Sequence, residues 1–350
     1  MRRPDVEIVV VGAGVMGLAA ARELARAGRA VALVEQFRIG HDRGSSHGRS
    51  RIFRLSYPDP RWVRLAQEAV PLWDELEAEA GETLIERHGS LDLGDWRPNR
   101  NALAEKGIAF EILAGTEIKR RFPLAVAAGE TGLFQVDGGI VRADAALAAL
   151  HASAAAAGAQ VLEETCIEAL DPDETGVTVS GFGVSIRAGV VVVTAGSWAR
   201  PLLEPQGIAL DVTPTRETVS YFALEHDEPV PSLIDFAEGG GPGQLGYALV
   251  APDVGLKAGI HHTGAVVDPD EPDAPGSPNA DIARWTADWV TKRFRGATPL
   301  GALETCLYTN TPDESFVLER HGRIVVGSAC SGHGFKFAPA VGVRLAALAR

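Results

Sequence analysis

The sequence predicts a mixed α/β fold made of two interleaved domains. The chain has 350 residues, more than the roughly 100 to 200 of a typical single domain. Its first forty residues have the pattern strand, glycine-rich turn, helix, strand. A second buried strand with a small-residue turn follows far downstream, at 190–198. A fold that begins near residue 7 and resumes near residue 190 implies that other structure is inserted between the two parts.

Composition limits the class of protein. Hydrophobic residues make up 46% and charged residues 23% of the chain, the balance of a globular protein. The net charge of −13 opposes the basic face that phosphate contacts require, so we expect no nucleic-acid partner. The most apolar stretch, Ile8–Ala21, is shorter than the ~20 residues of a membrane helix and contains glycines, so we expect no membrane partner. The N-terminus has no cationic leader with a cleavage pattern, which predicts a cytoplasmic location.

The cysteines indicate reduced thiols. There are three, Cys166, Cys306 and Cys330, and none is spaced as in a CxxC motif. An odd number without that spacing favours free thiols over a disulfide frame or a zinc site. We therefore expect no metal site.

The N-terminal segment is a βαβ unit. The apolar run Glu7–Val11 predicts a buried strand, and the Ala- and Leu-rich run Leu18–Ala27 predicts a helix, which Gly28 stops. A second apolar strand, Ala30–Val34, follows at once. The segment therefore has every element of the βαβ unit that begins a dinucleotide-binding domain.

The turn inside this unit has the G-x-G-x-x-G pattern. Gly12 makes the tight turn, Gly14 lets the backbone approach a pyrophosphate, and Gly17 lets helix and strand pack closely. The second strand ends at Glu35, near the spacing of the acidic residue that binds a ribose. A carboxylate there would repel a 2′-phosphate, so the pattern predicts FAD or NAD, and it does not decide between them.

Three later segments favour FAD. The polar, basic loop Gly44–Arg54 comes soon after the second predicted strand, where an NAD-dependent dehydrogenase would continue with alternating strands and helices. The buried strand and small-residue turn Val190–Trp198 indicate that the dinucleotide fold resumes after an insertion. The third segment, Gly332–Lys336, follows the strand Ile324–Gly327 and precedes a helical pattern.

Together these segments resemble the glycine oxidase/D-amino-acid oxidase superfamily of flavoproteins, and within it the monomeric sarcosine oxidase and N-methyltryptophan oxidase branch. The resemblance is spread over nearly the whole chain. The motifs that carry it are, in order, V-V-G-A-G-V-M-G-L-A-A, S-R-I-F-R, T-A-G-S-W, G-L-K-A-G-I-H, C-L-Y-T-N-T-P-D and S-G-H-G-F-K-F.

The resemblance implies an α/β (α+β) architecture. A Rossmann-like FAD-binding domain would comprise residues 1–85, 140–205 and 305–350. It would be interleaved with a mostly antiparallel β-sheet substrate domain, residues 86–139 and 206–304.

The resemblance also implies a catalytic site. Cys306 matches the cysteine that carries the flavin through a thioether. Lys257 matches the lysine that activates oxygen, where a fixed cation stabilises the charge that oxygen gains; a bare strand lysine facing water is the alternative. Arg54 and Lys336 match the two cations that hold a substrate carboxylate.

Three more residues match catalytic positions of this branch. Arg51 matches the arginine beside the flavin ring, where positive charge favours the anionic form. His261 matches an active-site histidine, with His262 as the alternative if the register differs by one. Tyr247 matches an active-site tyrosine. The residues expected to contact the cofactor are Gly12, Gly14, Gly17, Glu35, Ser45, His47, Arg51, Thr194, Gly196, Trp198, Cys306, Gly332, Gly334 and Lys336.

The expected function is that of an FAD-dependent oxidase. Its substrate would be a small secondary amine or an N-methyl or cyclic amino acid with a carboxylate, and its partner would be O2, giving an imine and H2O2. Oxidation at an N-methyl group and at Cα both remain open. So do electron transfer to a quinone or carrier protein, flavin binding without turnover, and the oligomeric state, for which a monomer is plausible.

Overall fold

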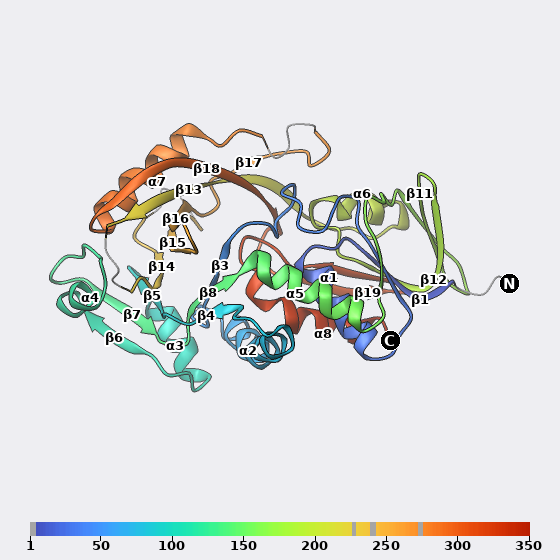
Figure 1. Ribbon diagram of the computed structural model, residues 1–350, viewed down its shortest axis with the longest axis horizontal. Coiled ribbons are helices and arrows are strands. Elements are labelled where there is room, and N and C mark those ends of the chain that lie inside the picture. The colour runs from blue at the N-terminus through green and yellow to red at the C-terminus, as the bar shows by residue number, and fades with distance from the viewer. Residues whose placement is uncertain (1–4, 226–228, 239–242, 272–275) are drawn as a thin grey trace.

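The computed structural model describes residues 5–225, 229–238, 243–271 and 276–350. Two large sheets dominate it, the first at the right and the second at the left of Figure 1. A small third sheet lies between them. The chain crosses between the large sheets several times, as expected for interleaved domains.

The first sheet has a parallel core of five strands. Their order is β9 (Gln160–Leu162), β2 (Val31–Val34), β1 (Val6–Val11), β12 (Val184–Val193) and β20 (Ile324–Ser328). β12 is long enough to pair with β20 near its end and with an antiparallel extension near its start. That extension is β11 (Val177–Gly181) followed by β10 (Ala169–Pro172), while β19 (Val317–His321) pairs with β20.

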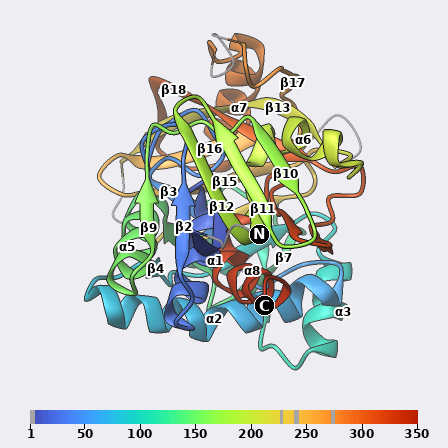
Figure 2. The same cartoon turned by 90° about the vertical axis from the view of Figure 1, so that its right-hand side faces the viewer.

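Both faces of this parallel core are buried, which explains the continuous apolar runs in its strands. Ile8 and Val10 face one hydrophobic cluster, and Val9 and Val11 face the other. Helices cover the first of these faces (Figure 2). They are α1 (Val15–Arg26), α2 (Pro60–Ala80), α5 (Ala143–Ala156) and α8 (Ala338–Leu348). On the other face lie β10, β11 and the short α6 (Ala199–Leu203).

The second sheet is mostly antiparallel. Its order is β17-β13-β16-β15-β14-β5-β7-β6, and β18 pairs with β13. Only the β14–β5 pair is parallel among the pairings described. The strands are β5 (Ser90–Leu93), β6 (Glu111–Ala114), β7 (Thr131–Gln135), β13 (Thr213–Leu224), β14 (Ser232–Asp235), β15 (Gly246–Ala251), β16 (Gly255–Ile260), β17 (Ala265–Val266) and β18 (Ala297–Asn310). The helices α3 (Arg97–Glu105), α4 (Gly115–Arg121) and α7 (Ala280–Arg293) accompany this sheet.

The small sheet consists of β3 (Ser50–Phe53), β8 (Gly139–Arg142) and β4 (Ile85–Glu86). β3 carries Arg51, and Arg54 follows directly. The basic loop of the sequence therefore ends in a strand between the two large sheets.

The fold class predicted from the sequence is confirmed, with one local correction. Helix α1 begins at Val15, three residues before the predicted start at Leu18. The difference arises because Gly14 is in an extended conformation (φ −66°, ψ 179°) and caps the helix, so the last glycine of the motif lies inside it.

We propose that the two large sheets mark the two domains expected from the sequence. All strands of the first sheet lie within residues 1–85, 140–205 and 305–350. Those of the second lie within 86–139 and 206–304, except that β18 extends to Asn310. β18 would therefore belong to both domains.

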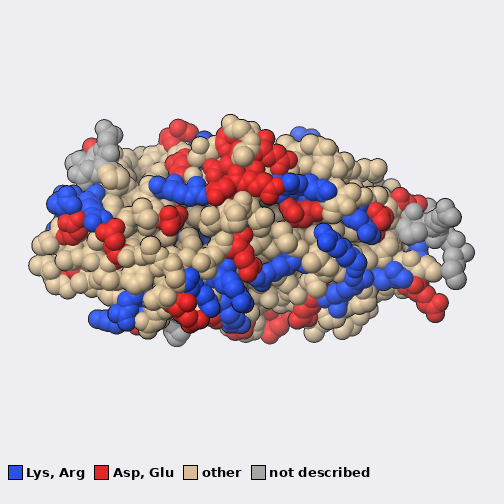
Figure 3. Space-filling model, turned by 90° about the horizontal axis from the view of Figure 1, so that it is seen from below, with Lys and Arg blue, Asp and Glu red and all other residues tan. Residues whose placement is uncertain are grey.

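Figure 3 shows the side on which α2 lies in Figure 1; acidic and basic side chains are mixed over this face. Ion pairs in the structure include Arg26 with Glu75 and Arg344 with Glu68. Within the part of the chain that the structure describes, every helix is too short or too polar to cross a bilayer.

Candidate active site

A cavity of about 360 Å³ runs along the carboxyl ends of the parallel strands and continues beneath the second sheet. Its walls at one end come from the segments that follow β1, β2, β12 and β20. At the other end they come from β15, β16 and β18. In open α/β sheets ligands bind in this crevice at the carboxyl ends of the strands, so the cavity is the candidate site.

The glycine motif packs against the turn after β12. A Cβ atom on Gly17 would lie 1.8 Å from the carbonyl oxygen of Gly12, and one on Gly12 would lie 2.7 Å from that of Thr194. The Thr194 hydroxyl donates to the carbonyls of Val11 and Gly12, at 3.1 and 3.0 Å. Only glycine fits at these two positions, and the close packing leaves the N-terminus of α1 facing the cavity.

That helix terminus carries the partial positive charge expected of unpaired backbone N–H groups. The N–H of Val15 donates to the hydroxyl of Ser46 at 3.1 Å, and Ser45 and Gly14 also line the cavity. The centre of the cavity therefore suits a pyrophosphate.

Glu35 forms the far end of the cavity and is only 5% exposed. Its carboxylate accepts from the backbone N–H groups of Ala13 (2.7 Å) and Phe37 (3.0 Å). Fixed in this way, its remaining lone pairs can accept hydroxyl groups, as a ribose-binding residue requires.

The turn after β12 lines the same end of the cavity. Gly196 has a left-handed φ of +53°, which glycine adopts without strain. The indole N–H of Trp198 donates to Asp270 at 2.9 Å, and its ring contacts the ring of Phe37 edge-on. Both residues were predicted cofactor contacts, and both line the cavity.

The basic loop places Arg51 in the cavity wall and His47 behind it. The Arg51 guanidinium donates to the carbonyls of Ser45 and Ser50, each at 3.0 Å. His47 is not among the lining residues described; its Nε2 lies 3.1 Å from the carbonyl of Thr305. Burial, and then the charge of Arg51, lower the pKa of His47. A direct contact of His47 with a cofactor stays a prediction, whereas a role in tethering the loop to β18 is visible.

Lys257 and Cys306 line the opposite end of the cavity, on β16 and β18. Lys257 is 6% exposed, which excludes the alternative of a strand lysine facing water. Burial, and then the charge of Arg51, lower its pKa to about 8. Burial raises the pKa of the Cys306 thiol, while Arg51 and Lys257 act in the opposite direction.

Arg54 and Lys336 are far apart in the sequence, but both contact the side chain of Tyr57. The Lys336 ammonium donates to the Tyr57 hydroxyl at 2.7 Å and to the carbonyl of His333 at 2.6 Å. The Arg54 guanidinium carbon lies 4.3 Å from the centre of the Tyr57 ring. Burial, and then Arg54, lower the pKa of Lys336 well below its usual value. The two buried cations therefore repel each other unless an anion binds.

The charges of this pair are poorly compensated. The nearest carboxylate oxygen to Arg54 is on Asp92, 3.7 Å from Nη1, and that Nη1 has no hydrogen-bond partner among the described residues. Burial raises the pKa of Asp92 itself, against the effect of Arg54. For Lys336, no carboxylate oxygen of the described residues lies within 4.0 Å of the ammonium. This part of the cavity suits a small anion.

His261 and Tyr247 complete the wall beside this cation pair. Nδ1 of His261 lies 3.3 Å from the hydroxyl of Tyr308. Burial, and then His262, lower the pKa of His261 well below its usual value, so its ring is neutral. Burial raises the pKa of Tyr247 and of Tyr308, so both phenols are protonated.

Gly332 and Gly334 allow the last segment to approach this wall. A Cβ atom on Gly332, whose φ is +70°, would lie 2.4 Å from the His261 ring and 2.3 Å from that of Tyr308. On Gly334 it would lie 1.9 Å from the carbonyl oxygen of Ala329. Both glycines also line the cavity.

Four residues of the site were not assigned a role from the sequence. Tyr57 and Tyr308 line the cavity, His333 accepts the second bond from Lys336, and Asp92 lies behind Arg54. Asp92 carried a signal, because a carboxylate in the apolar strand Ser90–Leu93 needs a buried partner. Tyr308 lies two residues from Cys306 and thus on the same face of the strand. Tyr57 and His333 carried no such signal.

The residues present fit FAD. The order along the cavity is a fixed carboxylate, a glycine cradle at a helix N-terminus, and an opposite end with Arg51, Lys257 and Cys306. A ribose, a pyrophosphate and an anionic flavin ring require these groups in this order.

Comparisons with known proteins agree with this fit. The family model described as FAD dependent oxidoreductase matches residues 7–348. Mouse peroxisomal sarcosine oxidase is 36% identical over 96% of this chain and 90% of its own length. Monomeric sarcosine oxidase from an Arthrobacter species is 31% identical over 99% and 93%. The open form of NikD, an unusual amino acid oxidase of nikkomycin biosynthesis, matches with a TM-score of 0.88 at 29% identity, over 98% of this chain and 93% of its own.

Proposed function

The chain belongs to the FAD-dependent oxidoreductase family, and from that premise we propose that it oxidises a small secondary amine carrying a carboxylate and passes the electrons to oxygen. The substrate would be an N-methyl or cyclic amino acid. The products would be an imine, which water hydrolyses or which remains cyclic, and H2O2. The named activity of the sarcosine oxidases that the chain resembles supports this choice.

The single observation that carries the proposal is the poorly compensated pair of cations, Arg54 and Lys336. A guanidinium fork binds a carboxylate through two parallel bonds, and an ammonium adds a point charge. Both cations are buried, Arg54 at 9% and Lys336 at 5% exposure, so water cannot replace the ligand at low cost. A substrate carboxylate placed there would orient the neighbouring C–N bond in the cavity.

FAD, when bound, supplies the two-electron oxidation of that C–N bond. The protein's own residues would orient the amine and exclude water. Neutral His261 and the protonated phenol of Tyr308 form a hydrogen-bonded wall that adds no charge near the amine. The amine can then stay uncharged in the site, as its oxidation requires.

Lys257 would assist the reaction with oxygen. Oxygen gains negative charge when it accepts an electron, and a cation held in a buried site stabilises that charge far more than one in water. The burial of Lys257 in the cavity wall that also contains Arg51 supports this role.

Cys306 would carry the cofactor covalently. Its side chain lines the same end of the cavity as Arg51 and Lys257, the two cations that lower its thiol pKa against the effect of burial. A thiolate is the nucleophilic form of cysteine, so these cations favour thioether formation. Cys166 and Cys330 also line the cavity, so they are the matched controls for any test of this assignment.

Two other functions share the fold. A dehydrogenase would use the same substrate subsite and pass electrons to a quinone or a carrier protein. A flavin-binding protein without turnover would not react with any amine. Buried Lys257 favours the oxidase over both, because neither alternative requires a cation at that position.

The test is a panel of amines in air, read by peroxide release. N-methyl amino acids should yield formaldehyde, the demethylated amino acid and one H2O2 per O2 and water consumed. Cyclic amino acids should yield a cyclic imine and H2O2 without formaldehyde. Flavin reduced by an amine but not reoxidised by air would support the dehydrogenase, and flavin reduced by no amine would contradict an enzymatic role.

A further inference from the structure

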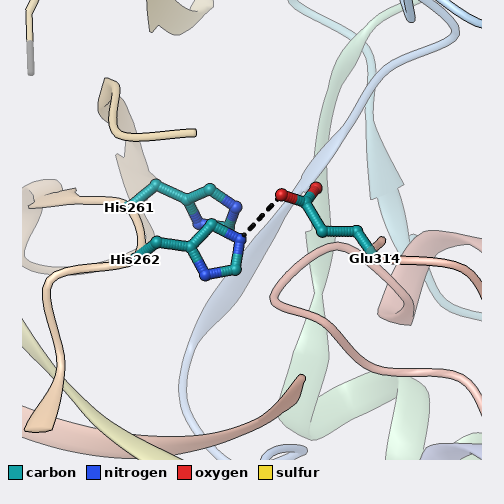
Figure 4. A group of neighbouring side chains, drawn as sticks. All are labelled: His261, His262 and Glu314. Carbon is teal, nitrogen blue, oxygen red and sulfur yellow. Dashed lines mark ion pairs between the residues drawn. The ribbon is translucent and has the colours of Figure 1, made fainter. Parts of the chain in front are cut away.

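A second group of side chains with ligand chemistry lies beside the substrate end of the cavity. It consists of His261, His262 and Glu314 (Figure 4). His261 lines the cavity, whereas His262 and Glu314 are not among its lining residues. Nothing in the proposed amine oxidation uses the last two.

The backbone turns the two histidines toward the same side. They follow β16 directly, and neighbours on an extended strand point to opposite faces. His262 instead has a left-handed φ of +55°, which is uncommon for a residue other than glycine. As a result the two imidazole rings lie with their centres 4.0 Å apart. Glu314 also has a left-handed φ, +60°, and its side chain points toward both rings (Figure 4).

The separations match those of metal ligands. Nε2 of His262 lies 3.2 Å from a carboxylate oxygen of Glu314. Metal–ligand bonds of about 2.0 to 2.2 Å that meet at a tetrahedral angle place two ligand atoms about 3.4 Å apart. One ligand atom from each of the three residues lies within 4.8 Å of the others, so a small rotation of His261 would complete the set.

The three side chains leave ligand atoms open to an ion. Nε2 of His262 has no aligned hydrogen-bond partner among the described residues, and the Glu314 carboxylate lies 3.2 Å from it. Nδ1 of His261 lies 3.3 Å from the Tyr308 hydroxyl, so Nε2 is the nitrogen of this ring that is left to bind an ion. The Glu314 side chain is 46% exposed, so an ion can reach the group from solvent.

The segment that carries Glu314 is held against the active site. The backbone carbonyl of Glu314 lies 3.1 Å from Nε2 of His333, whose own carbonyl accepts from Lys336. The position of the Glu314 carboxylate is therefore linked to the cation that we place at the substrate.

We propose that His261, His262 and Glu314 form a binding site for a divalent transition-metal ion of the zinc class, with a fourth position open to water. Two imidazoles and one carboxylate suit Zn²⁺, Cu²⁺ and Ni²⁺ better than Mg²⁺ or Ca²⁺, which prefer oxygen ligands only. The ion would draw His261 away from Tyr308 on the cavity wall. Metal binding would therefore inhibit turnover reversibly, and this second part rests on the proposed function.

The test titrates Zn²⁺ into the purified flavoprotein by calorimetry and records the electron paramagnetic resonance of Cu²⁺ bound to it. His262→Asn removes one ligand and suits the left-handed backbone, since asparagine adopts it more readily than most residues. Glu314→Gln keeps the shape of the side chain. Each should weaken Zn²⁺ binding by at least about tenfold, and His262→Asn should reduce the coupled nitrogens in the Cu²⁺ spectrum from two to one.

His321→Asn is the matched control. His321 and Glu319 also form a pair at 3.2 Å, and they belong to no described group of three ligands. This variant should bind Zn²⁺ as the parent protein does. Absence of saturable Zn²⁺ binding, or equal affinity in the parent, His262→Asn and Glu314→Gln, would overturn the site. Calorimetry and resonance need no turnover, so they decide the site even if the amine proposal fails.

If the site is present, Zn²⁺ should lower the amine-dependent rate of the parent, and a chelator should restore it. His262→Asn should require at least about a tenfold higher Zn²⁺ concentration than the parent for the same inhibition. Saturable binding without any effect on the rate would keep the site and overturn its link to His261.

Discussion

The ammonium of Lys336 donates a hydrogen bond to the phenol of Tyr57 across 2.7 Å, although both side chains are buried. A buried cation bonded only to neutral groups is unfavourable, and its lowered pKa expresses that cost. A bound carboxylate would compensate the charge of Lys336. We therefore expect the protein to be more stable with such a ligand bound than without it.

Lys336→Met tests this relationship. The substitution keeps the length of the side chain and removes the charge. A hydrogen bond to a charged group contributes about 1.5 to 3 kcal/mol, so KM for an amino-acid substrate should rise about 10- to 100-fold. The rate with an analogue that lacks the carboxylate should change little. Lys292→Met, at an exposed position of α7, is the control; an unchanged KM in Lys336→Met would remove this residue from the substrate site.

Lys257→Met should separate the two halves of the reaction. Loss of one fixed electrostatic partner of a developing charge typically costs about 10²- to 10³-fold in rate, so oxygen consumption should fall by that amount. The rate with an artificial dye as electron acceptor should remain within a few-fold. Equal losses with both acceptors would show that Lys257 acts on the amine instead.

The pH dependence of the oxygen reaction follows from the same residue. The pKa of Lys257 is lowered to about 8 by burial and by Arg51. The cation is therefore present below pH 8 and lost above it, so the oxygen-dependent rate should fall as the pH rises through about 8. Rapid mixing of the pre-reduced protein with oxygen, from pH 6 to 10, measures this. In Lys257→Met that step should be absent; a fall that persists there would belong to another group.

Cys306→Ala should release the cofactor. If the thioether forms at this residue, the denatured parent protein carries the added mass of one FAD, and the variant does not. Cys166→Ala and Cys330→Ala should keep the added mass, although both cysteines line the same cavity. Intact mass spectrometry decides between the three thiols, and an unmodified mass in the parent would contradict covalent attachment.

Gly17→Ala should destabilise the protein and abolish cofactor binding. A Cβ atom would lie 1.8 Å from the carbonyl oxygen of Gly12 and 2.6 Å from the Thr194 hydroxyl. Overpacking of this kind costs about 1 to 3 kcal/mol or more, measured as a lower midpoint of thermal unfolding. At Gly129, by contrast, an added Cβ meets nothing within 4 Å. Gly129→Ala should therefore unfold at the parent's temperature, and equal effects at both sites would contradict the packing argument.

The first βαβ unit was predictable because its causes are local. The G-x-G-x-x-G pattern of Gly12, Gly14 and Gly17 predicts a turn that few other sequences form. Glu35 follows at the spacing that this motif requires. The helix start was misplaced because a glycine served as the cap, and glycine gives no side-chain signal.

The remaining part of the site depended on contacts that local sequence does not encode. Tyr57 joins Lys336 from 279 positions away, and Glu314 reaches His262 across a separate loop. The two histidines share a side only because His262 adopts a left-handed φ, which a strand pattern does not predict. Residue types suggested the chemistry, but long-range packing decided which of them meet.

β18 stays paired with β13 in the second sheet and brings Cys306 to a cavity that also contains Gly12, from the turn after β1. The cavity also needs Thr194, and its last lining residue is Lys336. During synthesis on a ribosome Arg51 is thus translated well before Cys306 and Lys336, so the end of the cavity to which these residues belong is completed late. A nascent chain that ends before Lys336 lacks part of the binding wall, so we expect tight cofactor binding only after this residue has emerged.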